Sequence, residues 1–193
     1  NYGSITFAQL KAMANHVIED NIPAPATYLN LAATVNPDGT CKTSDPKNWG
    51  SSNPTHPCYS YFPIIVVTGG QIEVSTGYGQ AIVLMDLMDG TGLEFGLEGP
   101  VTLAGLIVGF GCVDIEDGAR MYGALFGDSE TADQNCEGSD GAVRLGKGGN
   151  GQALWSSCTI QKVLEATGAA AASGGVPIAG VRRLARGFQT PLR

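Results

Sequence analysis

The acidic turns of this sequence hold the residue types that come nearest to a functional site. Three such turns lie between residues 86 and 133, and the best placed carboxylates are Asp86, Asp89, Asp114, Glu116 and Asp117. Calcium prefers carboxylate and main-chain oxygens, which turns of this kind supply, although none of them follows the twelve-residue EF-hand loop. Asp-Gly is also an ordinary turn sequence. Calcium is therefore the one cofactor that the sequence suggests, with solvated turns as the simpler interpretation.

Other catalytic patterns are incomplete. Gly141–Gly148 imitates a phosphate-binding loop, but Gly148 stands where the magnesium-binding Ser or Thr should be. A serine hydrolase of the elbow type needs Gly-x-Ser-x-Gly, which the sequence lacks. Glu94 and Glu98 share one face of a predicted strand, where four residues separate them by about 13 Å. That distance exceeds the roughly 6.5–9.5 Å of an inverting glycosidase, so we expect a protein that is not an enzyme.

Charge is distributed unevenly along the chain. Residues 1–175 hold all 18 acidic and 7 of the 11 basic residues, whereas residues 176–193 hold four arginines and no acid. A basic end on an acidic body suggests docking on an acidic surface, of a second copy or of the same chain. The predicted assembly interface comprises Arg182, Arg183, Leu184, Arg186 and Phe188. A net charge of −7 without a basic stripe argues against nucleic acid as a partner.

Five cysteines and a charged fraction of only 15% favour an extracellular protein. No Cys-x-x-Cys pair is present and only two histidines are available, so a zinc site lacks its usual ligand spacing. We predict the disulfides Cys41–Cys58 and Cys136–Cys158, with Cys112 as a buried free thiol, although other pairings are open to five cysteines. The predicted localisation is accordingly secreted or at the cell surface.

Two helices are expected, one near each end of the domain. Ser4 is a good N-cap, and apolar residues follow at helical spacing to Asp20. Residues 158–166 predict a short second helix. Between the first helix and the strands, Ala24–Pro57 is rich in Pro, Asn, Ser and Thr, which predicts a long loop pinned by the first disulfide.

The pattern of a β-sheet runs from Phe62 to Phe126. Alternation is sharpest at residues 93–98, and Val101–Cys112 is nearly continuously apolar, which predicts a central strand covered on both faces. The apolar run is too short to span a membrane as a helix. Because the turns between strands are short, we predict an antiparallel meander. No long internal repeat is apparent.

The predicted fold is α+β: an N-terminal helix packed on an antiparallel β-meander of five to seven strands, with disulfide-pinned loops, a short C-terminal helix and a basic tail. Residues 1–168 are expected to form a single domain, and residues 169–193 a spacer and a basic docking segment. The layout from Ser4 to Cys158 is similar to the soluble domain of type IV pilins, in which a helix is followed by a loop, a meander and a Cys-closed region. The long apolar N-terminal helix by which pilins polymerise is not found in residues 1–193.

The preferred function is that of an exported structural or filament-forming subunit whose basic end packs on copies of itself. The alternative is a secreted adhesion module that presents the Ala24–Pro57 loop, with Trp49, Tyr59 and Tyr61, to a glycan or a surface protein. A small extracellular hydrolase is the third hypothesis.

Overall fold

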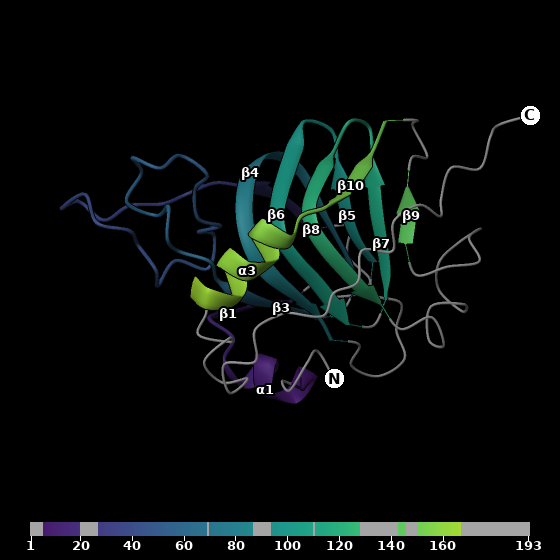
Figure 1. The fold of residues 1–193 in the computed structure, drawn as a ribbon, viewed down its shortest axis with the longest axis horizontal. Helices are drawn as coiled ribbons and strands as arrows, with labels where there is room; N and C mark the ends of the chain where they lie inside the picture. Colours follow the sequence, from purple (N-terminus) through teal and green to yellow (C-terminus); the bar gives the residue numbers. More distant parts are fainter. Residues whose placement is uncertain are drawn as a thin grey trace, which may run out of the picture.

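The computed structural model describes residues 6–19, 27–68, 70–86, 94–109, 111–127, 143–145 and 150–166. Two helices and ten strands lie in these ranges (Figure 1). In chain order they are α1 (Phe7–Ala12), β1 (His16–Glu19), β2 (Thr27–Leu31), β3 (Ile64–Thr68), β4 (Gln71–Met85), β5 (Glu94–Glu98), β6 (Val101–Gly109), β7 (Cys112–Glu116), β8 (Arg120–Gly127), β9 (Val143–Leu145), β10 (Gln152–Trp155) and α3 (Ser157–Ala166).

All ladders between these strands are parallel, so the predicted antiparallel meander is wrong. Ile64 pairs with Ile82, Ile82 with Leu106 and Leu106 with Ala124, and the chain therefore returns to the same place after 18, 24 and 18 residues. Parallel neighbours need a long connection. Here the connection is one turn of the chain around the structure, which we call a coil and which itself contains further strands. The described strands thus form one sheet that winds around itself as a parallel β-solenoid.

The solenoid has three faces. The first contains β1, β3 and the C-terminal parts of β4, β6 and β8. The second contains β2, the N-terminal part of β4, β5, β7 and β9. The third contains the middle of β4 and the N-terminal parts of β6 and β8, and ends with β10. In Figure 1 the strands β4, β6, β8 and β10 follow one another from left to right, and β7 and β9 lie at the right.

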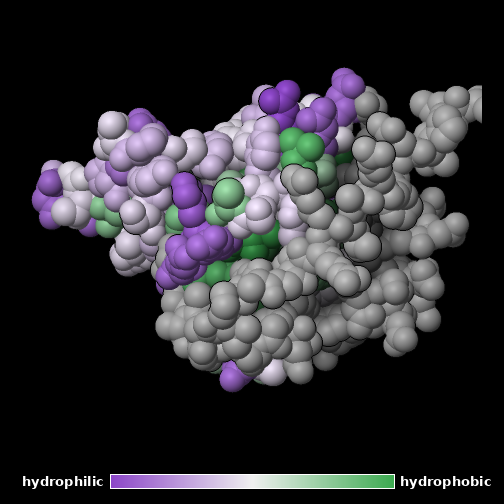
Figure 2. Space-filling model, viewed as in Figure 1, coloured by the Kyte–Doolittle hydropathy of each residue, from purple (hydrophilic) through white to green (hydrophobic). Residues whose placement is uncertain are grey.

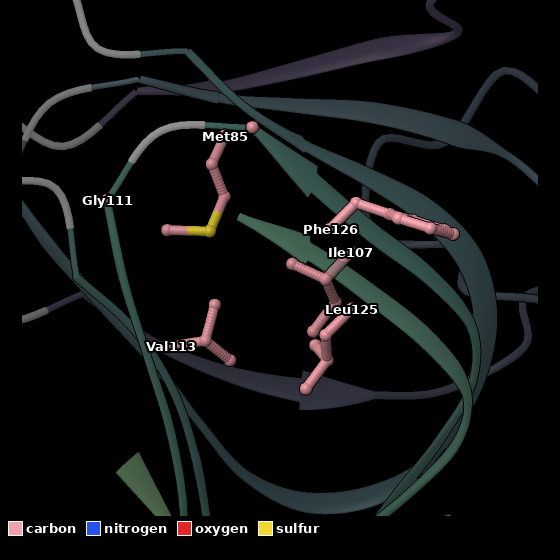
Figure 3. Close-up of a pocket in the computed structure, with 7 residues that line it drawn as sticks. Met85, Ile107, Gly111, Val113, Leu125 and Phe126 are labelled. Atoms are coloured by element: carbon pink, nitrogen blue, oxygen red, sulfur yellow. The ribbon is translucent and has the colours of Figure 1, made fainter. Parts of the chain in front are cut away.

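The interior of the solenoid is a hydrophobic core to which all three faces contribute. Met85, Val113 and Leu125 come from three different strands and turn toward one another inside the coil (Figure 3). Each fully buried aliphatic side chain contributes roughly 1.5–3 kcal/mol to folding. The stack of coils is therefore held mainly by this core.

The outer side of the first face is also apolar, and the helices cover it. Outward side chains of β3, β4 and β6 form a second hydrophobic cluster with Leu10 of α1 and with Ile160 and Val163 of α3. Burial on both sides explains the continuous apolar run that begins at Val101, because every residue of β6 except Thr102 is buried. The prediction of a strand covered on both faces is confirmed.

The helix predicted from Ser4 to Asp20 is confined, within the described residues, to Phe7–Ala12, which begins with a capping box at Thr6. Beyond it the chain forms β1 instead. Asn15 fixes this change, since its side-chain oxygen accepts a hydrogen bond from the main-chain N–H of Ile64 at 2.7 Å, where the pairing with β3 begins. The spacing of the apolar residues is compatible with a helix and with a strand. Pairing with β3 stabilises the strand. Within the described ranges, neither helix is long and apolar enough to cross a membrane.

The predicted loop Ala24–Pro57 contains β2, which pairs with β4. The disulfide Cys41–Cys58 pins the rest of this segment, as predicted. Cys112 is also disulfide-bonded, and Cys158 is an exposed free thiol. The predicted free thiol at Cys112 and the bridge Cys136–Cys158 are therefore wrong. Spacing along the sequence favours disulfides that close short loops. The coil instead places β7, which begins with Cys112, beside β9, which is distant in the chain.

Candidate functional site

A polar hollow opens on the outer side of the second face. It has a volume of about 190 Å³ and is formed by the N-terminal part of β4 together with β5 and β7. The residues that line it are Gln71, Glu73, Glu94, Gly96, Leu97, Glu98, Asp114 and Glu116. Five of them are carboxylates and none is basic. We call the five side chains Glu73, Glu94, Glu98, Asp114 and Glu116 the acidic face.

The parallel register builds the acidic face from residues that are far apart in the sequence. Glu73, Gly96 and Asp114 are register partners on three successive strands, and Glu98 is the partner of Glu116. Neighbouring strands lie about 4.8 Å apart, so side chains in register are close neighbours. Gly96 has no side chain, which leaves the space between Glu73 and Asp114 open. A Cβ at Gly96 would reach to 3.5 Å from the side chain of Glu73.

Among the described residues, the charge of the acidic face is only partly compensated. Like charges directly opposite each other on neighbouring strands are destabilising, and Glu98 and Glu116 have this arrangement. Oε1 of Glu116 is buried and has no hydrogen-bond partner among the described residues, although buried polar atoms normally have one. Glu73, Glu94 and Asp114 do interact with other groups of the chain. A cationic partner would therefore reduce the electrostatic repulsion most at Glu98 and Glu116.

The predicted calcium ligands are not brought together. Asp114 and Glu116 line the hollow, but Asp86 follows the far end of β4 and forms an ion pair with a lysine of α1. Asp117 lies in an exposed turn after β7, with a φ of 47°, and Asp89 lies outside the described residues. In the part of the chain that the structure describes, no three His, Cys, Asp or Glu side chains are grouped so that they could hold a metal ion.

Trp49, Tyr59 and Tyr61, the predicted ligand-binding residues, do not form a common surface. Trp49 is only 1% exposed and belongs to the interior core. The tyrosines are half-buried and hold the loop in place. The hydroxyl of Tyr61 donates to the main-chain oxygen of Thr43 at 2.9 Å, and Nζ of Lys162 donates to the hydroxyl of Tyr59 at 3.3 Å. These aromatic residues therefore contribute to the packing of the loop.

His16 of β1 belongs to the same contact. Its Nε2 lies 3.0 Å from the hydroxyl of Tyr61. Burial lowers the pKa of His16, although Asp45 and a hydrogen bond with Thr43 act in the opposite direction. Burial also raises the pKa of Tyr61, with a smaller contribution from Asp45. The neutral imidazole and the neutral phenol are thus the forms that this contact favours.

A second hollow, inside the solenoid, is apolar and holds only about 10 Å³ (Figure 3). Met85, Ile107, Val113 and Leu125 line it, while the ring of Phe126 points to the opposite side of its strand. A single water molecule needs at least about 10–15 Å³ measured in this way, together with polar partners. The hollow is therefore a packing gap and not a binding site.

No sequence pattern pointed to β10, yet this strand carries the most exposed large apolar side chain of the described residues. Trp155 is 56% exposed and Leu154 is 41% exposed. β10 pairs only with β8 among the described strands. The sequence feature that could have indicated this strand is the short uncharged stretch Gln152–Trp155, which lies between a glycine cluster and the capping residue Ser156.

The residues predicted to form the assembly interface lie outside the described part of the chain, and so does one predicted disulfide cysteine. They are Arg182, Arg183, Leu184, Arg186, Phe188 and Cys136.

Comparison with known proteins identifies no relative: no family model matches this chain, and neither a curated protein nor a solved structure is significantly similar to it.

Proposed function

We propose that the protein is an exported, non-enzymatic structural subunit that assembles with copies of itself. The basic C-terminal segment, residues 176–193, docks on the acidic face of a neighbouring copy. One observation carries this proposal. A hollow lined by five carboxylates occurs in the same chain whose last eighteen residues hold four arginines and no acid.

The chemistry of the two surfaces is complementary. Arginine binds carboxylates through two parallel hydrogen bonds. Arg182, Arg183 and Arg186 can each bind a different carboxylate of the acidic face. Exposed ion pairs contribute about 0.2–1 kcal/mol each, so three of them supply roughly 0.6–3 kcal/mol. The apolar residues Leu184 and Phe188 must add to this for a lasting contact. We therefore expect assembly that weakens strongly with salt.

Export is supported by the cysteine chemistry. Cys41 and Cys58 are bridged, and Cys112 is also in a disulfide. Disulfides persist in oxidising compartments and are rare in the cytosol. A low charged fraction of 15% is consistent with an extracellular protein.

Multi-angle light scattering of the full-length protein tests the proposal. We expect assemblies larger than a dimer in about 20 mM NaCl and their dissociation in about 500 mM NaCl, since the Debye length falls from roughly 20 Å to roughly 4 Å. The double variant Glu98→Lys, Glu116→Lys should remain monomeric at low salt. The matched control, Glu19→Lys with Glu165→Lys, makes the same change of charge at exposed carboxylates of β1 and α3 and should assemble normally.

Deletion of residues 176–193 separates this proposal from other kinds of association. We expect the shortened chain to lose the assembly that depends on low salt. Assembly that survives the deletion and still weakens with salt, or a full-length protein that is monomeric at low salt, contradicts the proposal.

A further inference from the structure

We propose that β10 is a second self-association surface, on which a second copy of the chain docks with its own β10, edge to edge. This surface lies at the end of the solenoid that follows β8, and it involves none of the residues of the acidic face. It does not depend on the docking of the basic segment.

One edge of β10 is unpaired among the described strands. The N–H groups of Gln152 and Ser156 donate to main-chain oxygens next to and within β8, at 2.9 and 3.2 Å. Alternate residues of a strand direct their main-chain groups to the same neighbour, so those of Ala153 and Trp155 point away from β8. No described residue forms a hydrogen bond with them on that side. Two N–H and two C=O groups are therefore offered to another strand.

The side chains of β10 favour association. All four residues are exposed and none is charged. Edge strands of monomeric proteins are usually protected by lysine, proline or a covering segment, and β10 contains neither lysine nor proline. Figure 2 shows apolar surface, in green, where β10 lies in Figure 1. Trp155 and Leu154 are the exposed apolar residues of this strand, and tryptophan is enriched in protein interfaces.

β10 is also held in its extended form before any partner binds. Its register with β8 fixes one side over four residue pairs. At its end, Oγ of Ser156 accepts a hydrogen bond from the N–H of Thr159 at 3.3 Å at the start of α3, and α3 packs on β6 and β8. A strand that is already ordered loses little conformational entropy when it pairs.

The uncharged, self-complementary edge of β10 fits a second copy as the occupant. Residues 1–175 hold 18 acidic and only 7 basic residues, so two copies repel each other when most of their surfaces approach. Two β10 strands bring no like charges of their own together, and a twofold axis gives each the same donors and acceptors. The opposite end of the solenoid differs, because β1 carries Glu19 and the segment between β2 and β3 extends from that end (Figure 1).

The expected contact is weak. Two strands of four residues bury far less than the roughly 800 Å² that each partner contributes to a stable interface. A dimer should therefore form only at high concentration. Where the basic segment also docks, the two contacts would strengthen each other by raising the effective concentration.

Sedimentation velocity of the full-length protein in about 500 mM NaCl tests β10 separately, because a Debye length of roughly 4 Å screens contacts between arginines and carboxylates. We expect a monomer–dimer equilibrium that Trp155→Lys and Ala153→Pro each weaken about tenfold or more. Proline at position 153 removes only the N–H that β8 does not use, so the fold should be retained. The matched control is Val17→Lys, which places the same charge on a 54% exposed apolar residue of β1 and should leave the dimer unchanged.

Hydrogen exchange then identifies what occupies the edge. In the proposed dimer, the amides of Ala153 and Trp155 become protected as the protein concentration rises. A monomer at all concentrations, or a dimer unaffected by Trp155→Lys and Ala153→Pro, contradicts the proposal. Protection of the two amides that does not depend on concentration means that the same chain covers the edge, and this also contradicts it. A high-salt dimer that persists after deletion of residues 176–193 supports β10 docking whatever the fate of the proposed function.

Discussion

Replacing Gly123 with alanine should strongly destabilise the protein, because the coils approach too closely there for a side chain. Gly123 of β8 lies in register with Gly105 of β6 and has a φ of 146°. A Cβ on Gly123 would lie 1.7 Å from the main-chain oxygen of Gly105 and 2.8 Å from its carbonyl carbon. Both atoms belong to the backbone, so they can move only if the ladder between two coils opens.

The expected loss of stability has three sources. Forcing an extra methyl group into a packed interior costs about 1–3 kcal/mol, and holding a non-glycine residue in a sparsely populated backbone conformation costs about 1–3 kcal/mol. A lost ladder hydrogen bond adds about 1 kcal/mol. Together these give about 3–7 kcal/mol, a large part of the roughly 5–15 kcal/mol that stabilises a typical domain.

Gly118→Ala is the matched control, because Gly118 has a φ of 91° and no atom lies within 4 Å of the position of a Cβ. Only the backbone cost of about 1–3 kcal/mol applies to it. Urea unfolding followed by tryptophan fluorescence, with Trp49 as the buried reporter, compares the two variants. Equal free energies of unfolding for Gly123→Ala and Gly118→Ala would refute the close stacking of parallel coils.

Three further predictions concern the loop and its contact with β1. Trp49→Ala should lower the free energy of unfolding by about 3–5 kcal/mol, and a loss below about 1 kcal/mol in a urea titration would contradict its place in the core. Cys41→Ser should cost about 3 kcal/mol, since the bridge to Cys58 spans a sequence separation of 17; an unchanged urea midpoint would count against this. The pKa of His16 is lowered in the folded state, mainly by burial, so its contribution to stability is complete above the unfolded pKa of about 6.5 and is lost as the pH falls from there through the lower pKa of the folded state. His16→Gln should reduce this pH dependence in thermal melts, and an identical pH profile for the variant would contradict the role of burial.

The existence of the strands was predictable, but their pairing was not. Alternation at residues 93–98 and the apolar run from Val101 correctly identified β5 and β6, because a buried strand has the same side-chain pattern in parallel and antiparallel sheets. The distinguishing signal was a repeat that sequence analysis missed. Gly105–Gly109 and Gly123–Gly127 have the same pattern, glycine, three apolar residues and glycine, at a spacing of 18 residues, which is the length of one coil.

The candidate site was predictable only in part for a related reason. Glu94 and Glu98 were correctly placed on one face of a strand, and both line the hollow. Their neighbours Glu73 and Asp114 come from other coils, and no local pattern indicates which residues the register will bring together. β1 was missed because its pairing with β3, and not its own residue preferences, decides that it is a strand.

Mixing two charge-reversed variants tests most directly whether the basic segment docks on the acidic face of another copy. One full-length variant carries Glu98→Lys and Glu116→Lys, and the other carries Arg182→Glu and Arg183→Glu. In low-salt light scattering we expect each variant alone to be monomeric and an equimolar mixture to assemble, since each reversed surface then meets a partner of opposite charge. A mixture that stays monomeric while the unmodified protein assembles, or variants that each assemble alone, would contradict docking between copies through these residues.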